Sequence, residues 1–316
     1  MNTFTRITFR ILPPLYELNR ATITVPGDHG SALIQFTITP SGASPVAGNA
    51  DSATIPGDDL GALHNTIVQV EIAAILAISP PGDGPVPEAQ VAAVDLLNLV
   101  VEHYRNVTGV AQIRRIPARH ARAFCWEQAT VDGRVGSGRF VGGSGLRPDG
   151  PPAEGLASGD PLIVAAIQEG VLAGRLPLWA ALYLDALAEF YTDNTRSGLV
   201  HLYMSFEMLA NETCQRLGEA VVGAEAASAF LAPPGDDPPV IHLVLKYTRE
   251  WAESGPSKSA ISRLVRSLWK HRNDLLHGRS LELPPGTAES ALVTFGELAT
   301  WLQSAQPAAA RSDRPR

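Results

Sequence analysis

Cysteines, lysines and long apolar runs are all scarce in this sequence. The 316 residues include 2 cysteines, so a disulfide framework is excluded and a reducing compartment fits. The longest apolar stretch, residues 67–78, is too short and too interrupted to span a bilayer. The first residues show no apolar segment with a cleavage site, so no secretory signal is expected. These absences predict a cytoplasmic protein with no membrane partner.

Basic residues are missing from a long part of the N-terminal half. No Lys or Arg occurs between Ala21 and Tyr104, so this surface is not expected to bind an RNA backbone. Residues 246–279, in contrast, hold 8 Lys/Arg and 3 Asp/Glu, a net +5 in a chain of net charge −7. All the lysines of the chain lie in that segment (Lys246, Lys258 and Lys270). Such a run is either a solvated helix face or an RNA-binding strip.

Enough apolar material is present for folded cores, at 45% of residues, and the length suggests two domains. The best candidate linker is the Gly/Pro/Ser-rich stretch 142–160. We therefore predict a mixed domain over residues 1–141, a linker over 142–160, a helical domain over 161–304 and a disordered tail over 305–316.

The N-terminal half carries mainly strand patterns. β-Branched, alternating runs predict strands at residues 3–12, 21–25 and 32–39, whereas residues 61–78 are apolar without a clean period and fit a strand or a helix. Residues 87–106 predict a helix that ends before Gly109. Residues 121–131 and 134–141 predict a hairpin around Asp132-Gly133, and this hairpin explains the glycines that follow better than a nucleotide-binding loop does.

The C-terminal half has helical periodicity throughout, with a break at the sequence PPGDDPP (residues 233–239). Helices are predicted at residues 162–171, 176–191, 197–217, 220–231, 240–253, 257–277 and 287–303. The predicted fold class is therefore α+β, with a strand-rich mixed domain followed by an all-α bundle.

The segment 264–279 contains the most informative pattern. On a helical projection with Ile261 as origin, Arg272 falls at about 20°, inside the apolar stripe. A guanidinium there needs a partner, because it cannot lose its proton. His277 lies at the expected helix end before Gly278, where the helix dipole favours the charged imidazole. Three cations are expected on the opposite, exposed face (Arg263, Arg266 and Lys270).

Residues 268–278, LWKHRNDLLHG, resemble the R-x4–6-H signature of the HEPN superfamily in the variant L-Y-x-x-R-N-x-x-x-H-G. Trp269 stands where the family usually has Tyr. Residues 198–209 resemble the long early helix of Apea-like HEPN domains, with Glu207 as the carboxylate on its inner edge. The resemblance covers residues 176–303, and none is found for the N-terminal half.

This resemblance implies a HEPN-like bundle and a metal-independent endoribonuclease without a cofactor, working as a homodimer through the Arg272–His277 helix. RNA supplies its own nucleophile, the ribose 2′-OH, so an imidazole and a guanidinium suffice for the chemistry. The implied roles are general acid/base for His277, phosphate clamp for Arg272 and orienting amide for Asn273. Supporting carboxylates (Glu207 and Asp274) and RNA-binding cations (Lys270, Arg266, Arg263 and Arg279) surround them. The implied biology is stress response or antiviral defence, as a toxin.

Two other interpretations stay open. Arg272 could be a structural partner of Glu207, with His277 as a helix cap, and the domain would then be a non-catalytic HEPN-type binding or assembly module. The motif could also be a coincidence in a plain helical scaffold. The N-terminal domain is interpreted as a sensor or as a binding site for an unidentified protein partner, for example a domain that holds the nuclease silent until a signal arrives.

Thiol and metal chemistry have weaker support in the sequence. Cys125 with His120 could form a nucleophilic pair, but no third member is identifiable, which favours a buried strand cysteine. The histidines show no metal-ligand spacing, so no metal site is expected.

Overall fold

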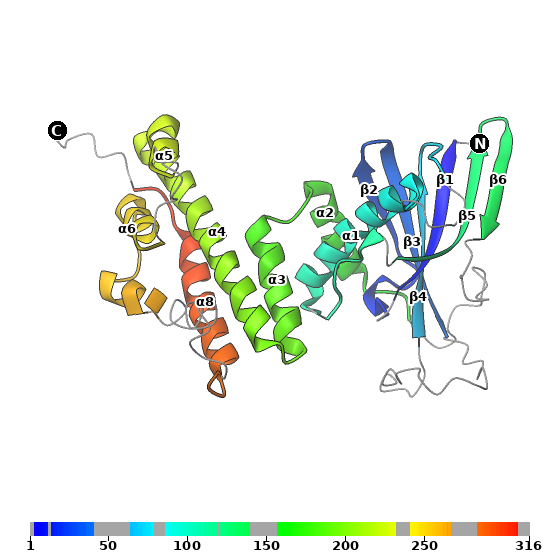
Figure 1. Ribbon diagram of the computed structural model, residues 1–316. Helices are drawn as coiled ribbons and strands as arrows, with labels where there is room; N and C mark the ends of the chain where they lie inside the picture. Colours follow the sequence, from blue (N-terminus) through cyan, green and yellow to red (C-terminus); the bar gives the residue numbers. More distant parts are fainter. Residues whose placement is uncertain are drawn as a thin grey trace. The chain divides into compact units, whose positions relative to one another are not determined.

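The computed structural model describes residues 3–11, 14–40, 64–78, 86–110, 112–118, 121–139, 157–231, 241–263, 265–266 and 283–308. The chain divides into two compact units, which we call the sheet unit (Met1–Arg175) and the helical unit (Leu176–Arg316). One antiparallel sheet dominates the first, and helices make up the second where it is described (Figure 1). The α+β fold class is thereby confirmed. No helix of the described ranges is long and apolar enough to cross a membrane.

The sheet has six strands in the order β2-β3-β4-β1-β5-β6, and neighbouring strands all pair antiparallel. Their bounds are β1 (Phe4–Ile11), β2 (Thr22–Gly27), β3 (Gly30–Pro40), β4 (His64–Ile72), β5 (Arg122–Thr130) and β6 (Gly133–Arg139). The ambiguous segment 61–78 thus contains strand β4. Apolar and polar residues do not alternate regularly in this segment, because the strand lies inside the sheet and has buried residues on both faces. Ile67 is buried on one face and Val68 on the other.

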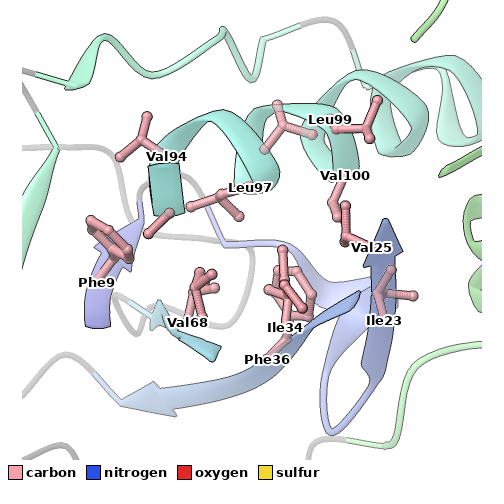
Figure 2. Packing of buried hydrophobic residues seen from close by; sticks show 14 of the residues in the cluster. Phe9, Ile23, Val25, Ile34, Phe36, Val68, Val94, Leu97, Leu99 and Val100 are labelled. Carbon is pink, nitrogen blue, oxygen red and sulfur yellow. The ribbon is translucent and has the colours of Figure 1, made fainter. Parts of the chain in front are cut away.

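One face of the sheet packs on helix α1 (Glu88–Thr108) to form the core of this unit. Alternate strand residues point to that face, among them Phe9, Val25, Ile34 and Val68, and α1 presents Val94, Leu97 and Val100 at helical spacing (Figure 2). Burial of each such side chain contributes about 1.5–3 kcal/mol. The helix ends where the sequence predicts, because Gly109 takes a left-handed φ of 72° as its C-cap.

Helix α2 (Pro161–Ala173) also belongs to the sheet unit, packing against α1 and β2. The Gln168 side chain donates from Nε2 to the Thr24 carbonyl and accepts from the Thr24 N–H with Oε1, both at 2.8 Å. Its amide therefore satisfies the open backbone of the edge strand β2. The predicted start of the helical domain at residue 161 is corrected: the boundary follows Arg175.

The C-terminal end of the predicted linker is also part of the sheet unit. Asn19 is 2% exposed; its Nδ2 donates to the Ala157 carbonyl at 2.8 Å, and its Oδ1 accepts from the Ile38 N–H at 3.0 Å. The Asn19 carbonyl accepts from the Gly159 N–H at 2.8 Å. Ala157 and Gly159 are thus bound to Asn19, which is itself bound to β3, and this corrects the assignment of residues 157–160 to a linker. Residues 140–156 lie outside the described ranges.

The glycines of β6 have a packing role. The predicted hairpin is present, and the indole of Trp126 on β5 lies against Gly136 and Gly138. A Cβ at Gly138 would lie 2.9 Å from the indole nitrogen, so only glycine lets the ring lie this close to the strand.

In the helical unit, α4 (Thr195–Val222) is the central element and contacts each of the other named helices. These are α3 (Leu178–Tyr191), α5 (Ala224–Leu231), α6 (Ile241–Trp251) and α8 (Thr287–Ser304). The sequence predicts a break near Gly218, but α4 continues to Val222. Gly218 serves close packing instead, since a Cβ there would lie 2.7 Å from the Trp251 ring.

The first residues of the predicted tail are ordered against this unit. Ala305 is buried, and its carbonyl accepts from Arg216 Nη2 at 2.8 Å. The Ala308 N–H donates to the Trp251 carbonyl at 2.7 Å, and Glu253 N–H donates to the Gln306 carbonyl at 2.8 Å. The disorder prediction is therefore corrected for residues 305–308, while residues 309–316 lie outside the described ranges.

Candidate functional site

The central motif of the sequence prediction lies outside the described residues. This applies to the three proposed catalytic residues and three of their neighbours (Arg272, Asn273, His277, Asp274, Lys270 and Arg279). Their positions and roles stay predictions. The described site consists of the helical residues that lead into the motif and of the elements around them.

The helical residues 258–263 and 265–266 have the orientation that the sequence predicts. The Ser257 hydroxyl accepts from the Ala260 N–H at 3.2 Å, as an N-cap does. Ile261 and Val265 are buried in the core of the helical unit, and Arg263 and Arg266 are exposed. The two cations can therefore meet a polyanion, while the apolar residues hold the helix to the bundle.

Glu207 stands at the edge of the apolar stripe of α4. It is half-buried, and its Oε1 accepts from the Tyr203 hydroxyl at 3.0 Å. The stripe itself is buried, as the sequence indicates (Leu199, Leu202, Tyr203, Phe206 and Ala210). Glu207 thus offers a positioned carboxylate beside the core, and its contact with Arg272 stays untested because Arg272 lies outside the described ranges.

A second group of cations surrounds an open cavity of about 360 Å³ between α6 and residues 258–262. Its rim carries Lys246, Arg249 and Lys258, with Glu250 as the acidic side chain among the lining residues. These cations belong to the basic segment 246–279, and the sequence alone indicates no separate role for them. The available signal was their spacing, because residues three and four apart share a helix face, which brings Lys246, Arg249 and Glu250 together.

Cys214 does not have the surroundings of a nucleophile. Burial raises the pKa of the Cys214 thiol above its ordinary value, and a hydrogen bond with Thr248 lowers it by less. A raised pKa reduces the thiolate fraction and therefore the reactivity. Cys125 is half-buried in β5, and its proposed partner His120 lies outside the described residues.

Tyr183 is also a structural group. Burial raises the pKa of its hydroxyl, and its ring stacks on Phe295 with 4.8 Å between centroids. Within the described ranges, no group of three or more His, Cys, Asp or Glu side chains could hold a metal ion.

Comparisons of the chain with family models, curated proteins and solved structures found no match. The assignment to the HEPN superfamily accordingly stays a prediction that depends on the motif and its helical context.

Proposed function

We propose that this chain is a metal-independent endoribonuclease of the HEPN type, working as a homodimer. The observation that carries the proposal is the motif RNDLLHG (residues 272–278), which continues from a segment with Arg263 and Arg266 exposed and Val265 buried. A cationic surface beside a paired Arg and His is the combination that phosphodiester cleavage needs.

The proposed reaction starts from the RNA itself. The ribose 2′ oxygen attacks the adjacent phosphorus, the bond from phosphorus to the 5′ oxygen breaks, and a 2′,3′-cyclic phosphate and a 5′-hydroxyl result. His277 takes the 2′-OH proton or gives a proton to the leaving 5′ oxygen, for which an imidazole with an ordinary pKa of about 6.5 is suited. Arg272 holds the phosphate and stabilises the added negative charge, and Asn273 orients a phosphate oxygen or His277.

The alternative is a non-catalytic HEPN-type binding or assembly module, in which Arg272 pairs with Glu207. The positioned carboxylate of Glu207 is the specific observation in its favour. Under this alternative, Arg272→Ala lowers stability, and Glu207→Gln lowers it through the same lost pair, whereas neither protein cleaves RNA.

The test is incubation of the full-length protein with varied RNAs in the presence of a chelator. We expect cleavage by the wild type, with 2′,3′-cyclic phosphate ends, and a loss of about 100-fold or more for His277→Ala, the usual size of a general acid/base contribution. His29→Ala is the matched control, because His29 is an exposed histidine outside the helical unit and outside the motif. Equal activity of the wild type and His277→Ala would show that any cleavage comes from a contaminant.

The sheet unit is proposed to regulate this activity by binding a protein partner. Its support is charge segregation, since no Lys or Arg occurs from Ala21 to Tyr104. A screen of RNA cleavage with and without cell extract measures such regulation.

A further inference from the structure

The basic cavity between α6 and residues 258–262 is lined by described residues that lie outside the motif in the sequence. We infer that it binds the backbone of single-stranded RNA and so helps to hold the substrate of the proposed nuclease. The inference rests on the proposed function, because it supplies the substrate grip of that same reaction.

The cations around the cavity are not neutralised by acidic side chains of the described residues. Neither Lys246, Arg249 nor Lys258 has an acidic side chain within ion-pair distance among the described residues. All three are exposed and share one rim with Glu250. The rim thus has a net charge of +2 at neutral pH, and a phosphate group would supply the missing counter-charge.

The guanidinium group of Arg249 is held in place by a hydrogen bond. Arg249 donates from Nε to the Pro256 carbonyl at 3.1 Å, which ties α6 to the turn before the next helical segment. Its terminal nitrogens have no hydrogen-bond partner within the described ranges. Because one contact already fixes the side chain, less conformational freedom is lost when the remaining donors meet a phosphate.

The third argument is the shape and chemistry of the cavity. About 360 Å³ accommodates one nucleotide unit, and the cavity is open, so a strand can enter and leave at its ends. None of the described residues that line the cavity is Phe, Tyr or Trp, and the adjacent Tyr247 packs on Phe230 with 4.3 Å between centroids. Because the described lining offers no such ring to stack on a base, the site should recognise the backbone and tolerate any sequence.

The test uses full-length protein that carries His277→Ala, so that RNA is bound but not cleaved. Lys246→Glu and Lys258→Glu are added together, and Arg249 is kept because of its contact with Pro256. The probe is a fluorescein-labelled single-stranded RNA pool of roughly 20 nucleotides, followed by anisotropy over a range of salt concentrations. Loss of two phosphate contacts weakens binding about 25-fold at about 0.1 M salt and makes the salt slope shallower by about 1.4.

Lys246→Glu and Lys258→Glu are also made singly, and Arg196→Glu is the matched control for each single charge reversal. Arg196 is an exposed cation near the start of α4, about 33 Å along the helix from Gly218, which contacts the end of α6. We expect the Arg196 variant to bind RNA nearly as the parent does. An equal loss for all reversed cations would mean that general charge, and no particular cavity, attracts the RNA, which overturns the inference.

Two further results separate the cavity from the proposed function. Unchanged binding and salt slope in the double variant, together with cleavage by the wild type, overturn the cavity site and leave the nuclease proposal standing. A wild type that neither binds nor cleaves RNA overturns both. Binding of 5′-AMP as tightly as the RNA pool identifies a mononucleotide site and overturns the strand assignment.

Discussion

The sheet unit and the helical unit use charged side chains in different ways. In the sheet unit, Arg6 on β1 donates to Glu71 on β4 at 3.1 Å and to Glu127 on β5 at 3.2 Å, across three neighbouring strands. Its buried Glu102 pairs with Arg115 at 3.2 Å. In the described part of the helical unit, the cations of α6 have no acidic partner within ion-pair distance.

This difference separates charges that stabilise the fold from charges that are available to a ligand. A cation between two carboxylates has its charge compensated and attracts a polyanion weakly. Cations without an acidic partner keep their charge available to an approaching anion. The difference in pairing therefore agrees with the proposal that RNA contacts the helical unit.

The largest effects are expected from the two separate cores. Phe36 in the sheet unit and Phe206 in the helical unit are both buried, and each belongs to the core cluster of its own unit. Phe36→Ala and Phe206→Ala should each cost about 3–5 kcal/mol through lost burial and a cavity. Calorimetry of the full chain should show two transitions, with a different one lowered by each variant. A single transition lowered equally by both would show that the units unfold together.

Local patterns predicted the elements of these cores well. Alternation predicted β1, a β-branched run predicted β3, and helical spacing predicted α1 with its glycine cap. The boundary after Arg175 could not be predicted in the same way, because α2 has an ordinary apolar pattern and its placement depends on Gln168 reaching Thr24, 144 residues away in the sequence. Such long-range hydrogen bonds leave no periodic signal.

Asn19→Ala is expected to have a smaller effect and tests the corrected linker. It removes two buried side-chain hydrogen bonds and leaves the Ile38 N–H without its acceptor, at a cost of about 1–3 kcal/mol. Limited proteolysis should detect faster cleavage near residues 157–160 than in the wild type. Asn65→Ala, also in the sheet unit, is a control. If Asn19→Ala is cleaved near residues 157–160 as slowly as the wild type is, other contacts hold these residues in place and Asn19 is not required.

The candidate site was predictable only in part. Helical projection from Ile261 gave the exposed faces of Arg263 and Arg266 and the buried Val265, because one helix carries its own period. The cavity needs α6 and the segment 258–262 to lie side by side, and the break at residues 233–239 says nothing about that arrangement. The sequence shows the cations of the cavity as part of a basic run, but it does not show that they surround one cavity.

The smallest expected effects compare Arg6→Met with Lys246→Met. Arg6→Met removes the ion pairs of Arg6 with Glu71 and Glu127 and should lower the free energy of unfolding by about 1 kcal/mol or less, because all three side chains are about one-third exposed. Added salt should shrink this loss, since it screens the interaction at the surface. Lys246→Met should cost no more than Arg6→Met, because Lys246 has no acidic partner among the described residues and lies over the Tyr247 ring at 5.2 Å from its centroid, a weak contact at an exposed site. That loss should not depend on ion-pair screening by salt. Urea unfolding at low and high salt gives both values. If Lys246→Met lowers the free energy of unfolding as much as Arg6→Met does, and if salt shrinks that loss, the charge of Lys246 stabilises the fold. The difference between the two units would then not hold for Lys246, a residue of the proposed RNA site.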